Sequence, residues 1–71
     1  MVVIRLERET PIELHNEGTI RHSYAEFERR NGHEVIFERR VVLAPGERKR
    51  LTLAPGEITI TVAVGVVIHG L

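Results

Sequence analysis

Apolar and polar residues alternate along most of the chain with a period of two, and no segment repeats its apolar residues with the period of a helix. A period of two is typical of β-strands, because successive side chains of a strand point to opposite faces. Gly and Pro clusters separate the alternating segments. The pattern predicts six strands, or seven if Gly65 divides the last one, over residues 2–6, 12–15, 19–29, 33–43, 48–53 and 57–68.

The strands at 19–29 and 33–43 are expected to form a hairpin, and their register follows from the loop length. A two-residue Asn31-Gly32 loop would mix apolar and charged side chains on both faces. A three-residue loop at 30–32, closing on Gly32 as a bulge, separates the two kinds. We therefore predict that Phe27 pairs with Val35 and Ala25 with Phe37. These four residues then face inward, and four carboxylates form a row on the outside: Glu26, Glu28, Glu34 and Glu38.

The string Leu-Ala-Pro-Gly-Glu occurs twice, at 43–47 and 53–57. Proline presets φ near −65° and glycine tolerates a positive φ, so Ala-Pro-Gly-Glu suits a type II turn with glycine at its third position. We expect positive φ at Gly46 and Gly56. A further polar turn, Asn16-Glu17-Gly18, is predicted to use Gly18 in a left-handed conformation.

In its order of strand and turn signals, the chain resembles the small immunoglobulin-like, fibronectin-like and CARDB-like β-sandwich modules of bacterial, archaeal or phage origin. The matching pieces are Tyr24 and the segments 16–18, 31–32, 43–47 and 53–62. The resemblance implies an all-β fold, an immunoglobulin-like antiparallel β-sandwich of six to seven strands. It also implies a role as a spacer, an adhesive unit or an assembly component. Similar free-standing domains decorate phage and virus particles.

Length and composition narrow the function further. A chain of 71 residues predicts one domain, 1–71, with little room for a deep substrate cavity. The absence of cysteine excludes a disulfide framework, a thiolate zinc site and a cysteine nucleophile. Ten basic and ten acidic residues cancel, so nucleic acid and anionic membranes are not attracted over long range. With no secretion signal and no apolar stretch of about 20 residues, we expect cytoplasmic synthesis without membrane insertion, and a virion is a compatible destination.

Candidate chemistry is sparse. Ser23 and His22 are neighbours on a predicted strand, so they point to opposite faces and do not make a nucleophile and base pair. The glutamate row lies on one face instead of across a cleft, as glycoside hydrolysis would need. The four histidines, at 15, 22, 33 and 69, lack zinc-ligand spacing, which leaves at most a two-histidine site of His15 and His22 if their strands pair. We predict no catalytic residue, no metal site and no cofactor.

Two basic clusters flank the first Pro-Gly turn, at 39–40 and 48–50. They are expected to form one basic rim. Nucleic-acid binding by a small β domain usually adds exposed aromatic rings for stacking, and the two phenylalanines are assigned to the core. Nucleic acid is therefore not favoured as a partner.

Charge is distributed unevenly along the chain, because all twenty charged residues lie between Arg5 and Glu57. We expect one face of the charge-free segment 58–71 to fill the core through Ile58, Ile60, Val62 and Val64. The other face fits either a central strand shielded by its neighbours or a tail, 65–71, that reaches a second subunit. Because a small domain without disulfides gains stability by association, we favour the second interpretation. The expected interface residues are Thr59, Thr61, Ala63, Val66, Val67, Ile68 and Leu71.

These observations predict a non-enzymatic structural or assembly module. It would self-associate as a homo-oligomer or dock on a larger protein particle such as a virion, a filament or a surface layer. The alternative is a β-sandwich module that binds a ligand or a metal through its histidines.

Overall fold

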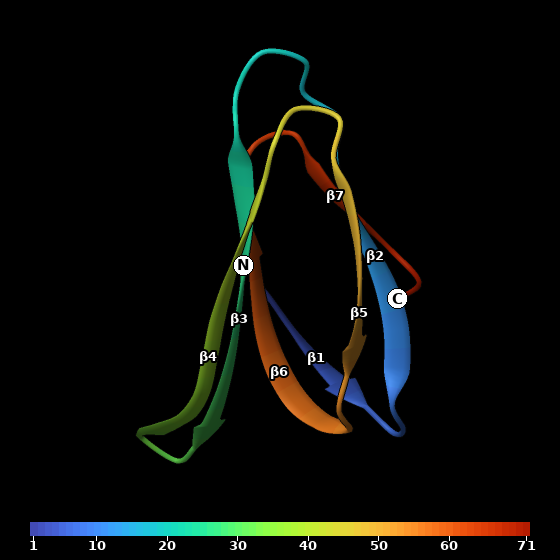
Figure 1. The fold of residues 1–71 in the computed structure, drawn as a ribbon. Coiled ribbons are helices and arrows are strands. Elements are labelled where there is room, and N and C mark those ends of the chain that lie inside the picture. The colour runs from blue at the N-terminus through green and yellow to red at the C-terminus, as the bar shows by residue number, and fades with distance from the viewer.

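The chain is all-β, with seven strands in two antiparallel sheets and no helix (Figure 1), in a computed structural model that describes all 71 residues. The strands are β1 (Val2–Leu6), β2 (Thr10–Asn16), β3 (Ser23–Asn31), β4 (Glu34–Leu43), β5 (Arg48–Leu53), β6 (Gly56–Val62) and β7 (Val66–His69). One sheet has the order β1-β6-β3-β4 and the other β5-β2-β7. The expected number of strands is confirmed, and Gly65 lies in the break between β6 and β7.

The chain passes from one sheet to the other at every connection except the β3–β4 hairpin. Each sheet therefore contributes apolar side chains to a shared core between the two layers. The ten buried core residues come from every strand but β1: Ile12, Leu14, Ala25, Phe27, Val41, Leu43, Leu53, Ile58, Ile60 and Val66. The edge strand β1 adds the partly buried Ile4 and Leu6 to this cluster.

Both Leu-Ala-Pro-Gly-Glu strings form crossings between the sheets, and they do so differently. In the first, Gly46 has φ 75° and the Glu47 N–H donates to the Ala44 carbonyl at 3.0 Å, as in a type II turn. In the second, Gly56 has φ 115° but no such turn bond forms. Gly56 is already the first residue of β6 and pairs with Leu6. The positive φ is confirmed at both glycines, and the type II turn at the first string.

The predicted hairpin register is wrong. Phe27 pairs with Arg39 and Ala25 with Val41. The turn consists of Gly32 and His33, with φ 63° at Gly32 and no positive φ at His33, the combination of a type II′ turn. The ladder then shifts between Arg29 and Arg30, which leaves Ile36 without a partner in β3.

The shift has a physical cause in the far half of β4. Val41 and Leu43 are buried beside Ala25 and Ser23. With this pairing, Ala25 lies opposite a β4 residue four positions further along the chain than the predicted partner. The bulge at Ile36 then turns Val35 to the outer face and Glu34 to the inner side, the reverse of our expectation. Phe37 keeps its inward direction but is 44% exposed, because it borders an open pocket between β4 and β5. In Figure 1 the tip of the hairpin projects away from the other strands.

Strand β6 is central in its sheet, between β1 and β3. After Val62 the chain crosses to the other sheet, where β7 pairs with β2. Val62 and Val64, which we expected in the core, are both exposed: Val62 is the last residue of β6, and Val64 lies beyond the end of the strand. Within one chain, the charge-free segment thus forms a central strand, a sheet crossing and the edge strand β7.

A buried asparagine ties the loops together at the end of the molecule where β2 finishes. Asn16 is 1% exposed. Its Nδ2 donates to the carbonyl oxygens of Arg21 at 3.1 Å and of Leu43 and Ala44 at 3.2 Å each. Its Oδ1 accepts the Gly18 N–H at 3.0 Å. One side chain therefore joins the β2–β3 loop to the β4–β5 crossing.

Two glycines make room for this amide. A Cβ atom at Gly18 would lie 3.0 Å from Asn16 Oδ1, and one at Gly65 would lie 3.1 Å from it. Gly65 also has φ 93°. Gly18 does not have a positive φ, so our expectation of a left-handed conformation there is wrong. Its role is close approach to the asparagine side chain.

The register can be checked by truncating the two phenylalanines. Phe27→Ala should lower the free energy of unfolding by about 3 to 5 kcal/mol, because it empties a fully buried site. Phe37→Ala should lower it by under about 1.5 kcal/mol, because much of that ring is already in water. Chemical denaturation measures both. Equal losses would contradict the observed register.

The hydrogen bonds of Asn16 predict that two asparagine substitutions differ in their effect on stability. Asn16→Ala leaves the Leu43 and Ala44 carbonyls without their donor and should destabilise the fold by about 2 to 4 kcal/mol. Asn31→Ala, at the exposed last residue of β3, should change stability by under about 0.5 kcal/mol. A thermal melt in which both variants match the wild type would show that the buried amide does not hold the loops.

Candidate interaction surface

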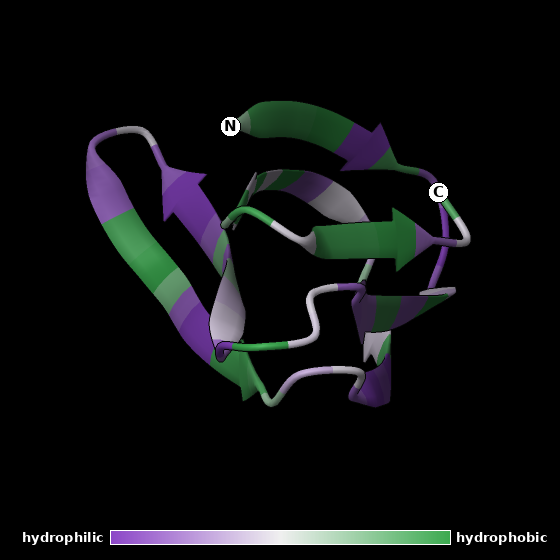
Figure 2. Cartoon of the chain, turned by 90° about the horizontal axis from the view of Figure 1, so that it is seen from above, coloured by the Kyte–Doolittle hydropathy of each residue, from purple (hydrophilic) through white to green (hydrophobic).

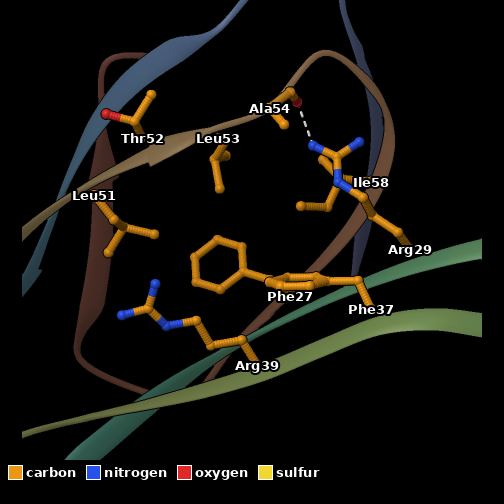
Figure 3. A pocket seen from close by; sticks show the side chains of 9 residues that line it. All are labelled: Phe27, Arg29, Phe37, Arg39, Leu51, Thr52, Leu53, Ala54 and Ile58. Carbon is orange, nitrogen blue, oxygen red and sulfur yellow. Dashed lines mark hydrogen bonds between the residues drawn. The ribbon is translucent and has the colours of Figure 1, made fainter.

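A groove opens along the side of the molecule where β4 and β5 are the edges of their sheets. Its volume is about 360 Å³, and Figure 3 shows the side chains that line it. Five apolar side chains from four strands form most of its lining, together with Ala54: Phe27, Phe37, Leu51, Leu53 and Ile58. The polar lining residues are Thr52 and two arginines, Arg29 and Arg39.

The groove exists because the hairpin diverges from the second sheet. The Lys49 Nζ donates to the Val42 carbonyl at 3.5 Å, which links β5 to β4 near the first Pro-Gly turn. Beyond this link the two strands separate. Phe27 is fully buried at the base, whereas Phe37 stands beside it and remains partly in water (Figure 3). An apolar surface that normally lies inside a sandwich is thereby left accessible.

Arg29 closes one end of the groove by capping the second Pro-Gly string. Its Nη1 donates to the carbonyls of Pro55 and Glu57 at 3.2 Å each, and its Nη2 donates to the carbonyl of Ala54 (Figure 3). This guanidinium takes the place of the turn bond that the second string lacks. A Cβ at Gly56 would lie 3.1 Å from Nη1, so glycine is also required for this close approach. The role of Arg29 is structural, and its charge is committed to the backbone.

Arg39 has a different environment. It projects from β4 opposite Phe27, and in Figure 3 its guanidinium lies near Leu51. No carboxylate lies within ion-pair distance of it, in contrast to Arg30, Arg40, Arg48 and Arg50. Arg39 is therefore a cation at an apolar groove that retains its capacity to bind an anion.

The other basic residues of the predicted rim are dispersed. Arg40 lies on the outer face, 4.1 Å from the centre of the Tyr24 ring and 3.6 Å from Glu26. Arg48 and Arg50 both contact Glu13, at 2.7 and 3.5 Å. The Arg48 hydrogen bond lowers the pKa of the Glu13 carboxyl, against a smaller opposing effect of desolvation. No continuous basic surface results.

The glutamate row is also divided. Glu26, Glu28 and Glu38 remain on the outer face, and Glu28 contacts Arg30 at 2.6 Å. This hydrogen bond raises the pKa of the Arg30 guanidinium. Glu34 has been turned to the inner side by the bulge at Ile36.

An exposed edge strand borders the groove. The first seven residues of β4, from Glu34 to Arg40, are all exposed. Its three consecutive apolar residues, Val35, Ile36 and Phe37, are between 40% and 60% exposed. Figure 2 shows this hydrophobic band within the outer strand of the hairpin, which stands apart from the remaining strands. An edge of this kind offers unpaired N–H and C=O groups to another strand.

The histidines do not converge. His15 lies on β2, His22 precedes β3, His33 is in the hairpin turn and His69 ends β7. Because β2 and β3 belong to different sheets, His15 and His22 do not face each other across a sheet. No group of three or more His, Cys, Asp or Glu side chains is placed to hold a metal ion. Ser23 donates its hydroxyl to the Val64 carbonyl at 2.8 Å, which anchors the β6–β7 crossing.

The seven residues expected at an interface are not brought together on one surface. Val66 is buried and Ile68 packs against the core, so both contribute to the domain itself. Thr59 and Thr61 lie opposite Glu28 and Glu26 on the first sheet. The remaining three lie elsewhere: Val67 pairs with His15 on the second sheet, Ala63 is in the crossing and Leu71 is exposed beyond β7.

Sequence reasoning missed the band Val35-Ile36-Phe37, although a signal was present. Three consecutive apolar residues cannot all face the core of a strand whose side chains alternate. Within a segment otherwise rich in charge, such a run indicates either a bulge or an exposed apolar edge. The structure contains both.

Comparison with known proteins gave no match: no family model, no curated protein and no solved structure matches this chain. No helix is present that is long and apolar enough to cross a membrane.

The cap on the second Pro-Gly string can be tested by mutation. Arg29→Ala should lower the free energy of unfolding by about 1 to 2 kcal/mol, because three carbonyls lose a charged donor at a partly solvated site. Arg39→Ala, which removes a guanidinium with no partner, should change it by under about 0.5 kcal/mol. Urea denaturation compares the two. A larger loss for Arg39→Ala would contradict the assigned roles.

Proposed function

We propose that this protein is a non-enzymatic structural or assembly module that associates through the exposed edge of β4. It self-associates or docks on a larger particle, such as a virion, a filament or a surface layer. The observation that carries the proposal is the segment from Glu34 to Arg40, which combines an unpaired strand edge with three exposed apolar side chains. Strand addition at such an edge is a common mode of protein recognition, because the backbone supplies affinity and alternate side chains supply specificity.

The resemblance to immunoglobulin-like modules is supported by the central strand pairs. In an immunoglobulin sandwich, the second strand pairs with the fifth in one sheet, and the third with the sixth in the other. The pairs β2–β5 and β3–β6 follow this arrangement. The other strands differ from the seven-strand arrangement, since β1 pairs with β6, β7 with β2, and β4 with β3 instead of β5. We propose an immunoglobulin-like sandwich that keeps these two central pairs and places its remaining strands differently.

The polar side chains support a role without catalysis. The side chains of Asn16, Ser23 and Arg29 donate hydrogen bonds to backbone carbonyls. The strongest ion pairs of Glu13 and Glu28 are with arginines on exposed faces. Groups used in this way hold loops and strands in place, and they leave no nucleophile paired with a base.

A second candidate function is favoured by the groove itself. Its apolar lining and the unpaired Arg39 suit a small apolar anion better than they suit a metal ion held by histidines. In this alternative the protein is a ligand-binding β-sandwich module, and the edge of β4 borders its binding site.

Light scattering over a concentration series tests the assembly role. The wild-type chain should exceed the monomer mass at high micromolar concentration. Ile36→Lys should return it towards the monomer, because a charge in an interface core is costly. Val64→Lys is the matched control, since Val64 is 97% exposed and lies in the β6–β7 crossing, beside Ser23 at the opposite end of β3 from the hairpin turn. A wild-type chain that stays monomeric throughout, with Ile36→Lys unchanged, would count against self-association through β4.

A further inference from the structure

We infer that the strand added at the β4 edge is β4 of a second copy of this chain, antiparallel to the first across a two-fold axis centred on Phe37. The inference rests on the proposed assembly function and names its partner. A two-fold pairing uses the same surface on both copies, so the surface must be complementary to itself. The segment from Glu34 to Arg40 meets that condition in charge, in apolar contact and in backbone pairing.

The charges of this segment are arranged with opposite signs on either side of Phe37. Glu34 and Arg39 both lie on the inner side of β4, one on each side of the centre. Neither has an ion-pair partner within its own chain. Glu34 is exposed at the hairpin tip and Arg39 lies at the groove. Each copy thus carries an anion and a cation that are both available.

The bulge determines how these charges align. In the ladder with β3, Phe37 pairs with Arg29 and Val35 with Arg30, so Ile36 is passed over. A second β4 that pairs with this edge in the same way places Phe37 opposite Phe37 and Val35 opposite Glu38. The next pair along the two strands joins Glu34 of one copy to Arg39 of the other, on the inner side. The two-fold axis repeats this pair, so the interface contains it twice.

Apolar contact and backbone pairing favour the same arrangement. Phe37, at 44% exposure, gains a neighbouring ring from the second copy. The two four-stranded sheets join into one sheet of eight strands, and the unpaired edge disappears. The association stops at two copies because it uses the β4 edge of each.

Strand geometry disfavours the competing parallel alignment. Because β4 has only one free edge, a parallel pairing of two copies through it would turn the second copy over. Its Glu34 and Arg39 would then lie on the opposite face from those of the first copy, and the two ion pairs could not form. A foreign strand would need an apolar residue flanked by the complementary pair of charges. A second copy already contains both.

A charge-exchange experiment tests this pairing by light scattering. Glu34→Arg and Arg39→Glu should each weaken self-association by about 10-fold or more, because each places like charges together twice. An equimolar mixture of the two variants should recover association, and so should the double variant Glu34→Arg/Arg39→Glu. The matched controls, Glu7→Arg and Arg8→Glu, change exposed charges in the β1–β2 connection and should leave association at the wild-type level.

Because the chain has no cysteine, disulfide formation gives an independent readout. Phe37→Cys should form a dimer under mild oxidation, since a residue on the two-fold axis faces its own copy at a Cα separation of about 4.5 to 5.5 Å. Val42→Cys, equally exposed on β4 but distant from the axis, should not.

The outcomes separate this inference from the function on which it rests. Recovery in the mixture together with selective cross-linking at position 37 supports the two-fold β4 pairing. A wild-type oligomer that neither charge variant weakens overturns this pairing and leaves the assembly role intact, through another surface or another strand. A wild-type chain that is monomeric at all concentrations overturns both this inference and self-association as the proposed function.

Discussion

The hydrogen bonds of the buried Asn16 amide hold one end of this small sandwich closed. Every connection but one crosses between the sheets, so the loops at that end must meet over the core without a disulfide to join them. A buried amide can satisfy several carbonyls at once, provided that all of its own groups are satisfied in return. Asn16 achieves this with three carbonyl acceptors and the Gly18 N–H. No buried side-chain nitrogen or oxygen of the protein is left without a partner.

The other end is held by a different kind of group. Arg29 caps three carbonyls of the second Pro-Gly string, but its guanidinium is solvent-accessible and the neighbouring hairpin extends beyond the second sheet. The two ends therefore differ in how completely they exclude water. The groove and the exposed part of β4 lie on the side that the second sheet leaves uncovered. Asn16 lies at the other end of the molecule, and Arg29 holds its loop at one end of the groove without using the edge of β4. The edge of β4 is therefore available for binding without loss of the fold.

An exposed edge strand normally carries features that prevent uncontrolled pairing, among them charges and bulges. Both are present in β4, at Glu34, Glu38 and Arg39 and at the unpaired Ile36. They do not remove the apolar band between them. Charges placed on either side of an apolar centre select one alignment among many, which distinguishes a specific interface from an aggregation site. This is the physical basis on which the assembly role and the two-fold pairing of β4 are proposed.

Much of the local structure was predictable from the sequence. The period of two identified the strands, and the bounds predicted for the strand at 48–53 are those of β5. The positive φ at Gly46 and Gly56 followed from turn chemistry within five residues. Such features depend on neighbours along the chain, and a single sequence contains that information.

Features that depend on distant partners were decided by the tertiary structure. The hairpin register was set by the burial of Val41 and Leu43, far from the turn that we used to predict it. From the sequence we interpreted Asn16 only as a polar turn residue, because the carbonyl groups that it binds lie up to 28 positions away along the chain. The charge-free segment suggested contact with a second subunit, and most of its residues lie in β6 and β7, which pair with β3 and β2 of the same chain. The candidate surface arose from a bulge and an uncovered hairpin, which alternation alone cannot locate, because a shift of one residue reverses the face of every side chain that follows.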